Sequence, residues 1–151
     1  MALDVSFQIS KVQMPNVADH LRLAKRLLRT ISYLSKENDQ HSEWIAVTAF
    51  YRALHLSEAV LLTNRIDHDR THVGRDQALK RTRSTENIWK HYRPLWQASC
   101  IARYLAFHDD EYVDFSSFMD PAKVISELIE YRLRELEKSV AKQLGTSIDS
   151  L

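Results

Sequence analysis

Residues 44–59 read WIAVTAFYRALHLSEA, and this stretch decides how the chain can fold. It predicts a helix over about residues 43–63, with Ser42 as the candidate N-cap and apolar side chains on nearly every side. A helix that is apolar all round is usually the central helix of its bundle. His55 and Glu58 lie one turn apart on this helix, and buried polar groups must find partners. The stretch therefore predicts a helical bundle that encloses a few polar groups.

Further helices can be placed outward from this stretch by their caps and apolar stripes. The expected helices are 17–35 after Asn16, 71–82 at Thr71, a short one from Ser84 or Thr85, 94–108 at Pro94, and 121–144 between Asp120 and Gly145. Only 2 of the 151 residues are glycine, against a usual share of about 7%. Sheets need glycine in turns and bulges, so its scarcity also favours helices.

The expected fold is all-α, an up-and-down bundle of four long helices with short helical pieces. It forms a single domain over residues 1–151. Residues 1–14 alternate weakly and are expected to form an N-terminal arm, and residues 145–151 are expected to be a frayed tail. A chain of this length buries enough surface to fold without disulfides or a structural metal.

Composition excludes several classes of protein. The net charge is +1, from 21 basic and 20 acidic residues, so bulk charge favours neither nucleic acid nor an anionic membrane. Cys100 is the only cysteine, which fits a reducing, cytoplasmic location. Residues 1–11 lack the basic start and apolar run of a signal peptide. The apolar runs are far shorter than the roughly 20 residues of a membrane span, so no membrane partner is expected.

Several ionisable residues cluster between residues 65 and 80. His68, His72 and Asp76 have the spacing of one helix face, which can present ligands to a divalent ion. However, His68 is expected to precede the helix, and no H-E-x-x-H pattern is present, so we predict neither a metal nor another cofactor. The alternative to a metal site is a structural role in helix capping and salt bridges, including one between Asp76 and Lys80. A third interpretation is a polar functional site built from His72 and Arg75.

Basic residues recur every five positions in this part of the chain: Arg65, Arg70, Arg75 and Lys80. Successive members lie about 140° apart on a helix, so they cannot form a single stripe along which RNA could bind. A patch shared with Arg93 or with the first helix stays open as an alternative.

Arg103 and His108 are candidates for phosphodiester chemistry. Histidine can move protons near neutral pH, and arginine can steady a charged phosphate. Five positions of separation place the two about 140° apart on a straight helix. They can act together only if the helix ends between them or if a second copy of the chain supplies one of them.

The order of three stretches resembles that of the HEPN superfamily of small helical bundles, in particular its small stand-alone bacterial and archaeal proteins. The stretches are residues 44–59, HDRTHVGRDQAL at residues 68–79, and YRPLWQASCIARY at residues 92–104, followed by the helix that begins at Asp120. Many members are metal-independent ribonucleases that act as dimers, with an arginine and a histidine roughly four to six residues apart. The resemblance implies that Arg103 is that arginine and His108 that histidine.

Two positions depart from the family pattern. Tyr104 stands where a small polar residue often follows the arginine, and Asp110 stands where toxin-like members have a tyrosine. Other members keep the bundle and serve as binding or assembly modules without nuclease activity.

The same comparison implies a polar cluster inside the bundle. Its members are Tyr51, His55 and Glu58 on the central helix, His72 and Arg75 on the third, and Ser99, Arg103 and Tyr104 on the fourth. A buried Glu58 would need a cation, and Arg75 or Arg103 is the natural choice. Such a cluster is either a structural network that fixes the helix register or a ligand pocket.

Two functions follow as predictions. The first is a cytoplasmic, non-enzymatic helical module, expected to be a homodimer, that binds a partner protein, a nucleotide or RNA at Tyr51, His55, Glu58, His72, Arg75 and Tyr104. The alternative is a metal-independent ribonuclease of the toxin–antitoxin or defence type. In that case Arg103 and His108 would be the catalytic residues.

Overall fold

The computed structural model describes residues 13–108 and 111–151, and no strand is present in this part of the chain. The all-α prediction is confirmed. The elements in chain order are α1 (Val17–Leu34), η1 (Ser35–Glu37), α2 (Asn38–Thr63), α3 (His72–Arg81), η2 (Arg83–Thr85), α4 (Glu86–Tyr104), α5 (Phe115–Phe118), η3 (Pro121–Lys123), η4 (Ile125–Leu133), α6 (Arg134–Leu144) and η5 (Ile148–Ser150). The N-terminal arm was expected over residues 1–14, of which residues 1–12 lie outside the described residues.

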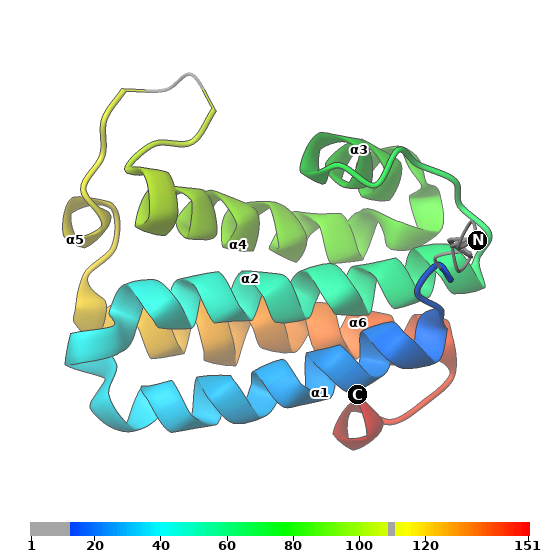
Figure 1. Ribbon diagram of the computed structural model, residues 1–151, viewed down its shortest axis with the longest axis horizontal. Helices are drawn as coiled ribbons and strands as arrows, with labels where there is room; N and C mark the ends of the chain where they lie inside the picture. Colours follow the sequence, from blue (N-terminus) through cyan, green and yellow to red (C-terminus); the bar gives the residue numbers. More distant parts are fainter. Residues whose placement is uncertain (1–12, 109–110) are drawn as a thin grey trace, which may run out of the picture.

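Helix α2 is the centre of the bundle, as its sequence predicts. It packs against α1 and α4, which run antiparallel to it, and against α6, which runs parallel to it (Figure 1). The helical stretch Val17–Thr63 is long and apolar enough to be compared with a membrane span, but 83% of its most apolar window is buried inside the protein. This burial is what a helix at the centre of a bundle shows.

The predicted caps at Asn16 and Thr71 form, whereas the one predicted at Ser42 does not. The Asn16 side chain accepts a hydrogen bond from the Asp19 amide, and the Asp19 carboxylate accepts one from the Asn16 amide, each at 3.0 Å. This reciprocal capping box begins α1. Thr71 Oγ1 accepts from the Gly74 amide at 2.9 Å and begins α3. Helix α2 starts earlier than expected, at Asn38, and the expected boundary near Ser42 is instead a kink at His41.

Helix α4 corrects the expectation that Pro94 divides two helices. The helix is continuous from Glu86 to Tyr104, with Pro94 inside it. A proline in a helix interior costs about 3 kcal/mol, because it lacks the amide hydrogen and crowds the preceding turn. Buried Tyr92 and Leu95 flank Pro94, so core packing on both sides offsets that cost. The helix ends four residues earlier than expected, because Leu105 adopts a left-handed conformation with φ 58°.

The last long helix starts at Asp120 and ends at Gly145 as predicted, but its middle is not α-helical. Residues Ile125–Leu133 form a π-helical segment, and the Arg134 amide still donates to the carbonyl of Ile129, five residues back. Helix α6 continues from this segment. Gly145, with φ 64°, provides the left-handed C-cap.

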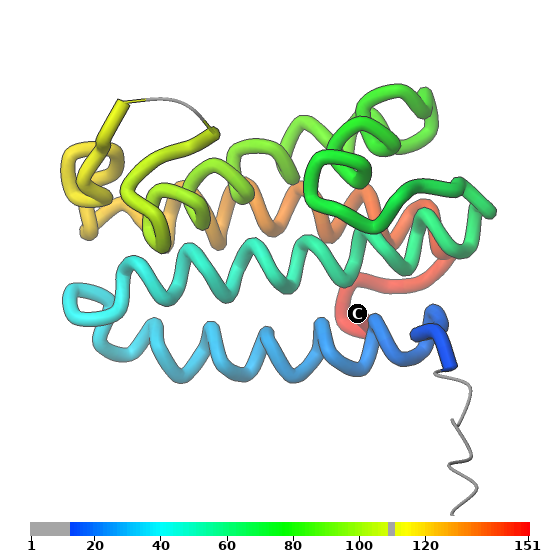
Figure 2. Tube along the Cα trace, turned by 45° about the horizontal axis from the view of Figure 1, so that its top comes forward, coloured from blue at the N-terminus to red at the C-terminus, as the bar shows by residue number. Residues whose placement is uncertain are grey.

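The tail is ordered, which corrects the prediction of fraying. Residues 148–150 form the turn η5, and Leu151 belongs to the hydrophobic core with 2% of its surface exposed. Figure 2 shows this segment folded back along the bundle. Burying two aliphatic side chains, Ile148 and Leu151, offsets the ordering of a short segment.

Candidate functional site

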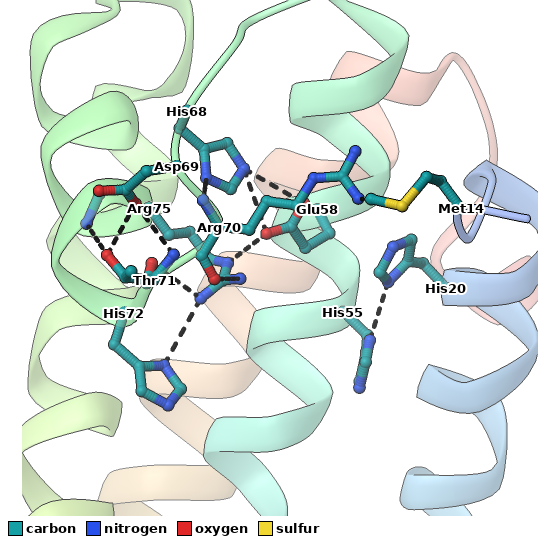
Figure 3. Close-up of polar contacts among 11 residues, drawn as sticks. Met14, His20, His55, Glu58, His68, Asp69, Arg70, Thr71, His72 and Arg75 are labelled. Atoms are coloured by element: carbon teal, nitrogen blue, oxygen red, sulfur yellow. Dashed lines mark hydrogen bonds and ion pairs between the residues drawn. The ribbon is translucent and has the colours of Figure 1, made fainter. Parts of the chain in front are cut away.

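Glu58 is the centre of a buried polar network at the junction of α2 and α3 (Figure 3). Only 5% of its surface is exposed, and Arg75, equally buried, donates from Nε to Glu58 Oε1. The Arg75 guanidinium also donates to the carbonyls of Arg70 at 3.2 Å and Thr71 at 3.4 Å. Of the two cations that the sequence offered for Glu58, Arg75 forms the ion pair, whereas Arg103 contacts Ser99, Tyr51 and Tyr104. The ion pair fastens the start of α3 to the central helix.

His68 belongs to the same network, although it lies before α3. Its Nε2 is 3.2 Å from Glu58 Oε1, and its Nδ1 accepts from the Arg70 amide at 2.9 Å. Asp76 faces another neighbourhood, where it accepts from Trp89 Nε1 at 2.9 Å and pairs with Arg93 at 2.8 Å rather than with Lys80. Within residues 13–108 and 111–151, no three His, Cys, Asp or Glu side chains are grouped to hold a metal ion.

His55 pairs with a histidine that the sequence analysis did not select. Its Nδ1 lies 2.9 Å from Nδ1 of His20 on α1, so one ring must donate and the other must accept. Burial is the main cause that lowers the pKa of both rings. For His55, the neighbouring His20 and Arg75 lower the pKa further, to about 4. Both rings are therefore neutral near pH 7.

The two histidines line a pocket of about 190 Å³ between α1, α2 and the connection into α3. We call it the histidine pocket, and its lining residues are Pro15, His20, Leu54, His55, Glu58, Leu62, Arg70 and Arg75. Within the part of the chain that the structure describes, no carboxylate pairs with Arg70, an exposed residue whose guanidinium donates to the sulfur of Met14 at 3.5 Å. The histidine pocket thus contains a guanidinium that is not neutralised by a described neighbour.

The rest of the predicted cluster forms a second, separate group. Arg103 Nη1 donates to the Tyr51 hydroxyl at 3.1 Å and to the Tyr104 hydroxyl at 3.4 Å, and its Nε donates to the Ser99 carbonyl. Arg103 and Trp44 line a pocket of about 380 Å³ between α2 and α4. We call it the tryptophan pocket.

His72 lies between the two groups. Its ring packs on Phe50 and Trp96, with centroids 5.4 and 5.9 Å apart, and its Nδ1 is 3.5 Å from Arg75 Nη1. Burial lowers the pKa of His72, and the positive charges of Arg75 and Arg103 lower it further. His72 is therefore a neutral ring within the electrostatic reach of both arginines.

Arg103 and His108 are not brought together within the described chain. The helix does end between them, at Leu105, as their joint action in one chain requires. His108 lies exposed beyond that end, with its ring 5.1 Å from Trp96 and 4.3 Å from Phe107. No hydrogen bond joins His108 to Arg103 in residues 13–108 and 111–151.

The most buried ion pair was missed in the sequence. Arg52 on α2 is 1% exposed and donates from Nε to Glu137 Oε1 on α6 at 2.7 Å. Its Nη1 donates to the Ala24 carbonyl on α1 at 2.7 Å. One guanidinium therefore joins three helices of the bundle. The available signal was a lone arginine in an otherwise apolar helix.

Comparisons with known proteins yielded no match: no family model, no curated protein and no solved structure is similar to this chain. The resemblance to HEPN proteins therefore stays a prediction. What the structure shows is the all-α bundle and the two pockets.

Proposed function

We propose that this chain is a non-enzymatic, HEPN-like helical module that binds a phosphate-bearing ligand, a nucleotide or RNA, in the histidine pocket. The single observation behind the proposal is the guanidinium of Arg70, which lines the pocket beside His20 and His55 and has no carboxylate partner in the described chain.

The balance of charges in the histidine pocket favours an anion. Glu58 neutralises Arg75, so Arg70 supplies the excess positive charge. A guanidinium offers a planar fork of donors that matches phosphate oxygens, and imidazole N–H groups can add further hydrogen bonds. The net charge of the whole chain is only +1, so attraction of this kind must be local rather than a property of the whole surface.

The separation of Arg103 and His108 in a single chain supports binding rather than catalysis. A general acid or base must lie within hydrogen-bond reach of the reacting group that the arginine steadies. In a single chain, His108 packs on Trp96 and Phe107 instead.

The test is a titration of the full chain with adenosine 5′-monophosphate and with a short mixed-sequence RNA, using adenosine as the ligand without phosphate. We expect Arg70→Ala to weaken binding of both phosphate-bearing ligands at least tenfold, the effect of losing about 1.4 kcal/mol of charge-assisted hydrogen bonding. Arg65→Ala is the matched control, because Arg65 is exposed in the same connection and is not among the described lining residues. Equal binding by the two variants would refute the proposal. Binding of adenosine as tight as that of adenosine 5′-monophosphate would refute it as well.

A metal-independent ribonuclease is the second candidate, and the tryptophan pocket favours it. Arg103 lines that pocket beside Trp44, an exposed aromatic on which an RNA base could stack. In a homodimer, His108 of a second copy would supply the missing acid or base.

Incubating the chain with labelled RNA, with and without a chelator, tests this second candidate. Cleavage should resist the chelator, leave a 2′,3′-cyclic phosphate and disappear in His108→Ala. Cleavage that survives in His108→Ala would contradict the assignment. Sedimentation of the wild type checks the homodimer, and a monomer at the assay concentration would count against it.

A further inference from the structure

The His20–His55 contact can store one added proton without losing its hydrogen bond. The Nδ1 atoms are 2.9 Å apart, so one ring donates from Nδ1 and holds a bare Nε2, while the other accepts at Nδ1. A proton added from solvent to that bare Nε2 makes an imidazolium whose Nδ1 still donates, and a charge-assisted hydrogen bond is stronger than a neutral one. A second proton would have to occupy the accepting Nδ1 and would break the contact.

The charged groups around the two rings come from four parts of the fold. Asp19 faces them from α1, Glu58 from α2, Arg70 from the connection and Arg75 from α3. Asp19 pairs with Arg22 at 3.2 Å, and Glu58 pairs with Arg75 and His68. Once these pairs are counted, the empty histidine pocket has one excess positive charge from the described residues, that of Arg70.

One excess positive charge balances a phosphodiester but not a terminal phosphate. A phosphodiester carries one negative charge, whereas the second pKa of a phosphate monoester is about 6, so at pH 7.5 it is mainly a dianion. A bound dianion therefore needs a second positive charge, and the histidine pair is the group in the described pocket that can gain one. The neutral state of the empty pair leaves this capacity unused until a ligand arrives.

We infer that the histidine pocket takes a terminal phosphate monoester, and that the His20–His55 pair takes up one proton from solvent as this dianion binds. The inference rests on the proposed function, because it concerns the same pocket. The pocket volume of about 190 Å³ suits a phosphate group with part of its sugar, and the apolar side chains of Leu54 and Leu62 form part of its lining. Such a phosphate could belong to a free nucleotide or to the end of an RNA strand.

Calorimetric titration of the full chain at pH 7.5 tests the proton uptake. Adenosine 5′-monophosphate is titrated in two buffers that differ in their enthalpy of ionisation, and the difference in observed enthalpy gives the number of protons taken up. The cyclic 3′,5′-monophosphate, a diester, is the matched ligand. We expect uptake close to one proton with the monoester, none with the diester, and about tenfold tighter binding of the monoester, as one charge-assisted hydrogen bond would provide.

His20→Asn and His55→Asn are the matched variants. An asparagine amide can lie near the place of Nδ1 and hydrogen-bond to the remaining ring, but it cannot be protonated. We expect each variant to bind the monoester about as weakly as the diester and to take up no proton. If a variant fails to fold, the comparison of the two nucleotides in the wild type still decides the inference.

The outcomes separate the inference from the proposed function. Monoester and diester binding equally, without proton uptake, would overturn the inference and leave the proposed function standing. Uptake that persists in both asparagine variants would also overturn it. Failure of every phosphate-bearing ligand to bind would refute the proposed function itself. Tighter binding of an RNA with a 5′-phosphate than of the same RNA with a 5′-hydroxyl would support the inference and identify an RNA end as the source of the phosphate. If only the free nucleotides show a preference for the monoester, the inference is supported and the source is a free nucleotide.

Discussion

Replacing Glu58 by glutamine removes the charge at the centre of the buried network and keeps the shape of the side chain. The wild-type carboxylate accepts from Arg75 Nε and lies 3.2 Å from His68 Nε2. Both Glu58 and Arg75 are 5% exposed, so the guanidinium left behind cannot be solvated by bulk water. The variant therefore tests how strongly this pair fastens α3 to α2.

The expected loss follows from the contacts that survive. Removing one member of a buried ion pair typically costs about 3–5 kcal/mol. Arg75 keeps the carbonyls of Arg70 at 3.2 Å and Thr71 at 3.4 Å, and the new amide oxygen can still accept from its Nε. We therefore expect a loss of about 2–3 kcal/mol, at the low end because these acceptors remain. For a domain of this size, that lowers Tm by about 4–12 °C.

The same substitution should strengthen binding of an anion. Glu58 lines the histidine pocket, so its negative charge repels a bound phosphate. A screened interaction of about 1 kcal/mol corresponds to roughly fivefold tighter binding in the variant. Stability and affinity should therefore change in opposite directions, which a purely structural network does not predict.

Urea unfolding followed by far-ultraviolet circular dichroism gives the stability, and titration with adenosine 5′-monophosphate gives the affinity. Glu127→Gln is the control, because Glu127 is exposed and forms no ion pair within residues 13–108 and 111–151. A loss of less than about 0.5 kcal/mol, the scatter of ordinary surface substitutions, would refute the reasoning about the buried pair. Unchanged affinity would refute the link between Glu58 and the pocket.

Three further predictions concern the rest of the bundle. Arg52→Met leaves Glu137 buried with Arg134 as its remaining ion-pair partner, at 3.5 Å, and should lower the free energy of unfolding in urea by about 3–4 kcal/mol. Adding Glu137→Leu should recover most of this loss, and an equal loss in the single and double variants would contradict the reasoning. The free energy of unfolding should fall by about 1–2 kcal/mol as the pH drops from 6.5 toward 4. In this range His55 of the unfolded chain binds a proton, whereas the half-buried His55 of the folded chain, with a pKa of about 4, does not. In thermal unfolding at a series of pH values, His55→Asn should show a smaller fall in Tm over this range. Gly145→Ala should cost about 1 kcal/mol in thermal unfolding, because φ is 64° although nothing crowds the added carbon, and an unchanged Tm would refute this.

The sequence predicted the helices best where one residue determines a boundary. Asn16 and Thr71 begin helices through side chains that bond to nearby amides, and Gly145 ends one through its own φ. The two main errors arose where tertiary packing overrides a local preference. Core contacts on both sides carry α4 through Pro94, and burial of Leu151 orders the tail.

The candidate site was predicted in part. A cationic partner for Glu58 could be anticipated, because a buried carboxylate needs one, but the sequence left Arg75 and Arg103 open and the structure shows Arg75. His20 stands four residues before Ala24 and eleven before Ile31, so its spacing places it on the buried stripe of α1. Spacing along one helix shows which face a residue occupies, but not which residue of another helix lies opposite. The contact between His20 and His55 therefore needed the structure.

The π-helical segment Ile125–Leu133 determines which side of the last helix faces the bundle. Each residue of an α-helix turns the chain by about 100°, so a segment that closes its hydrogen bonds one residue further back changes which side all later residues face. Glu137 follows this segment and pairs with Arg52 at 2.7 Å, so its position depends on that offset. Deleting one residue here would relax the wider turn and rotate that carboxylate away from the central helix. Insertions and deletions in related chains should therefore avoid residues 125–137, even where the amino acids themselves vary freely.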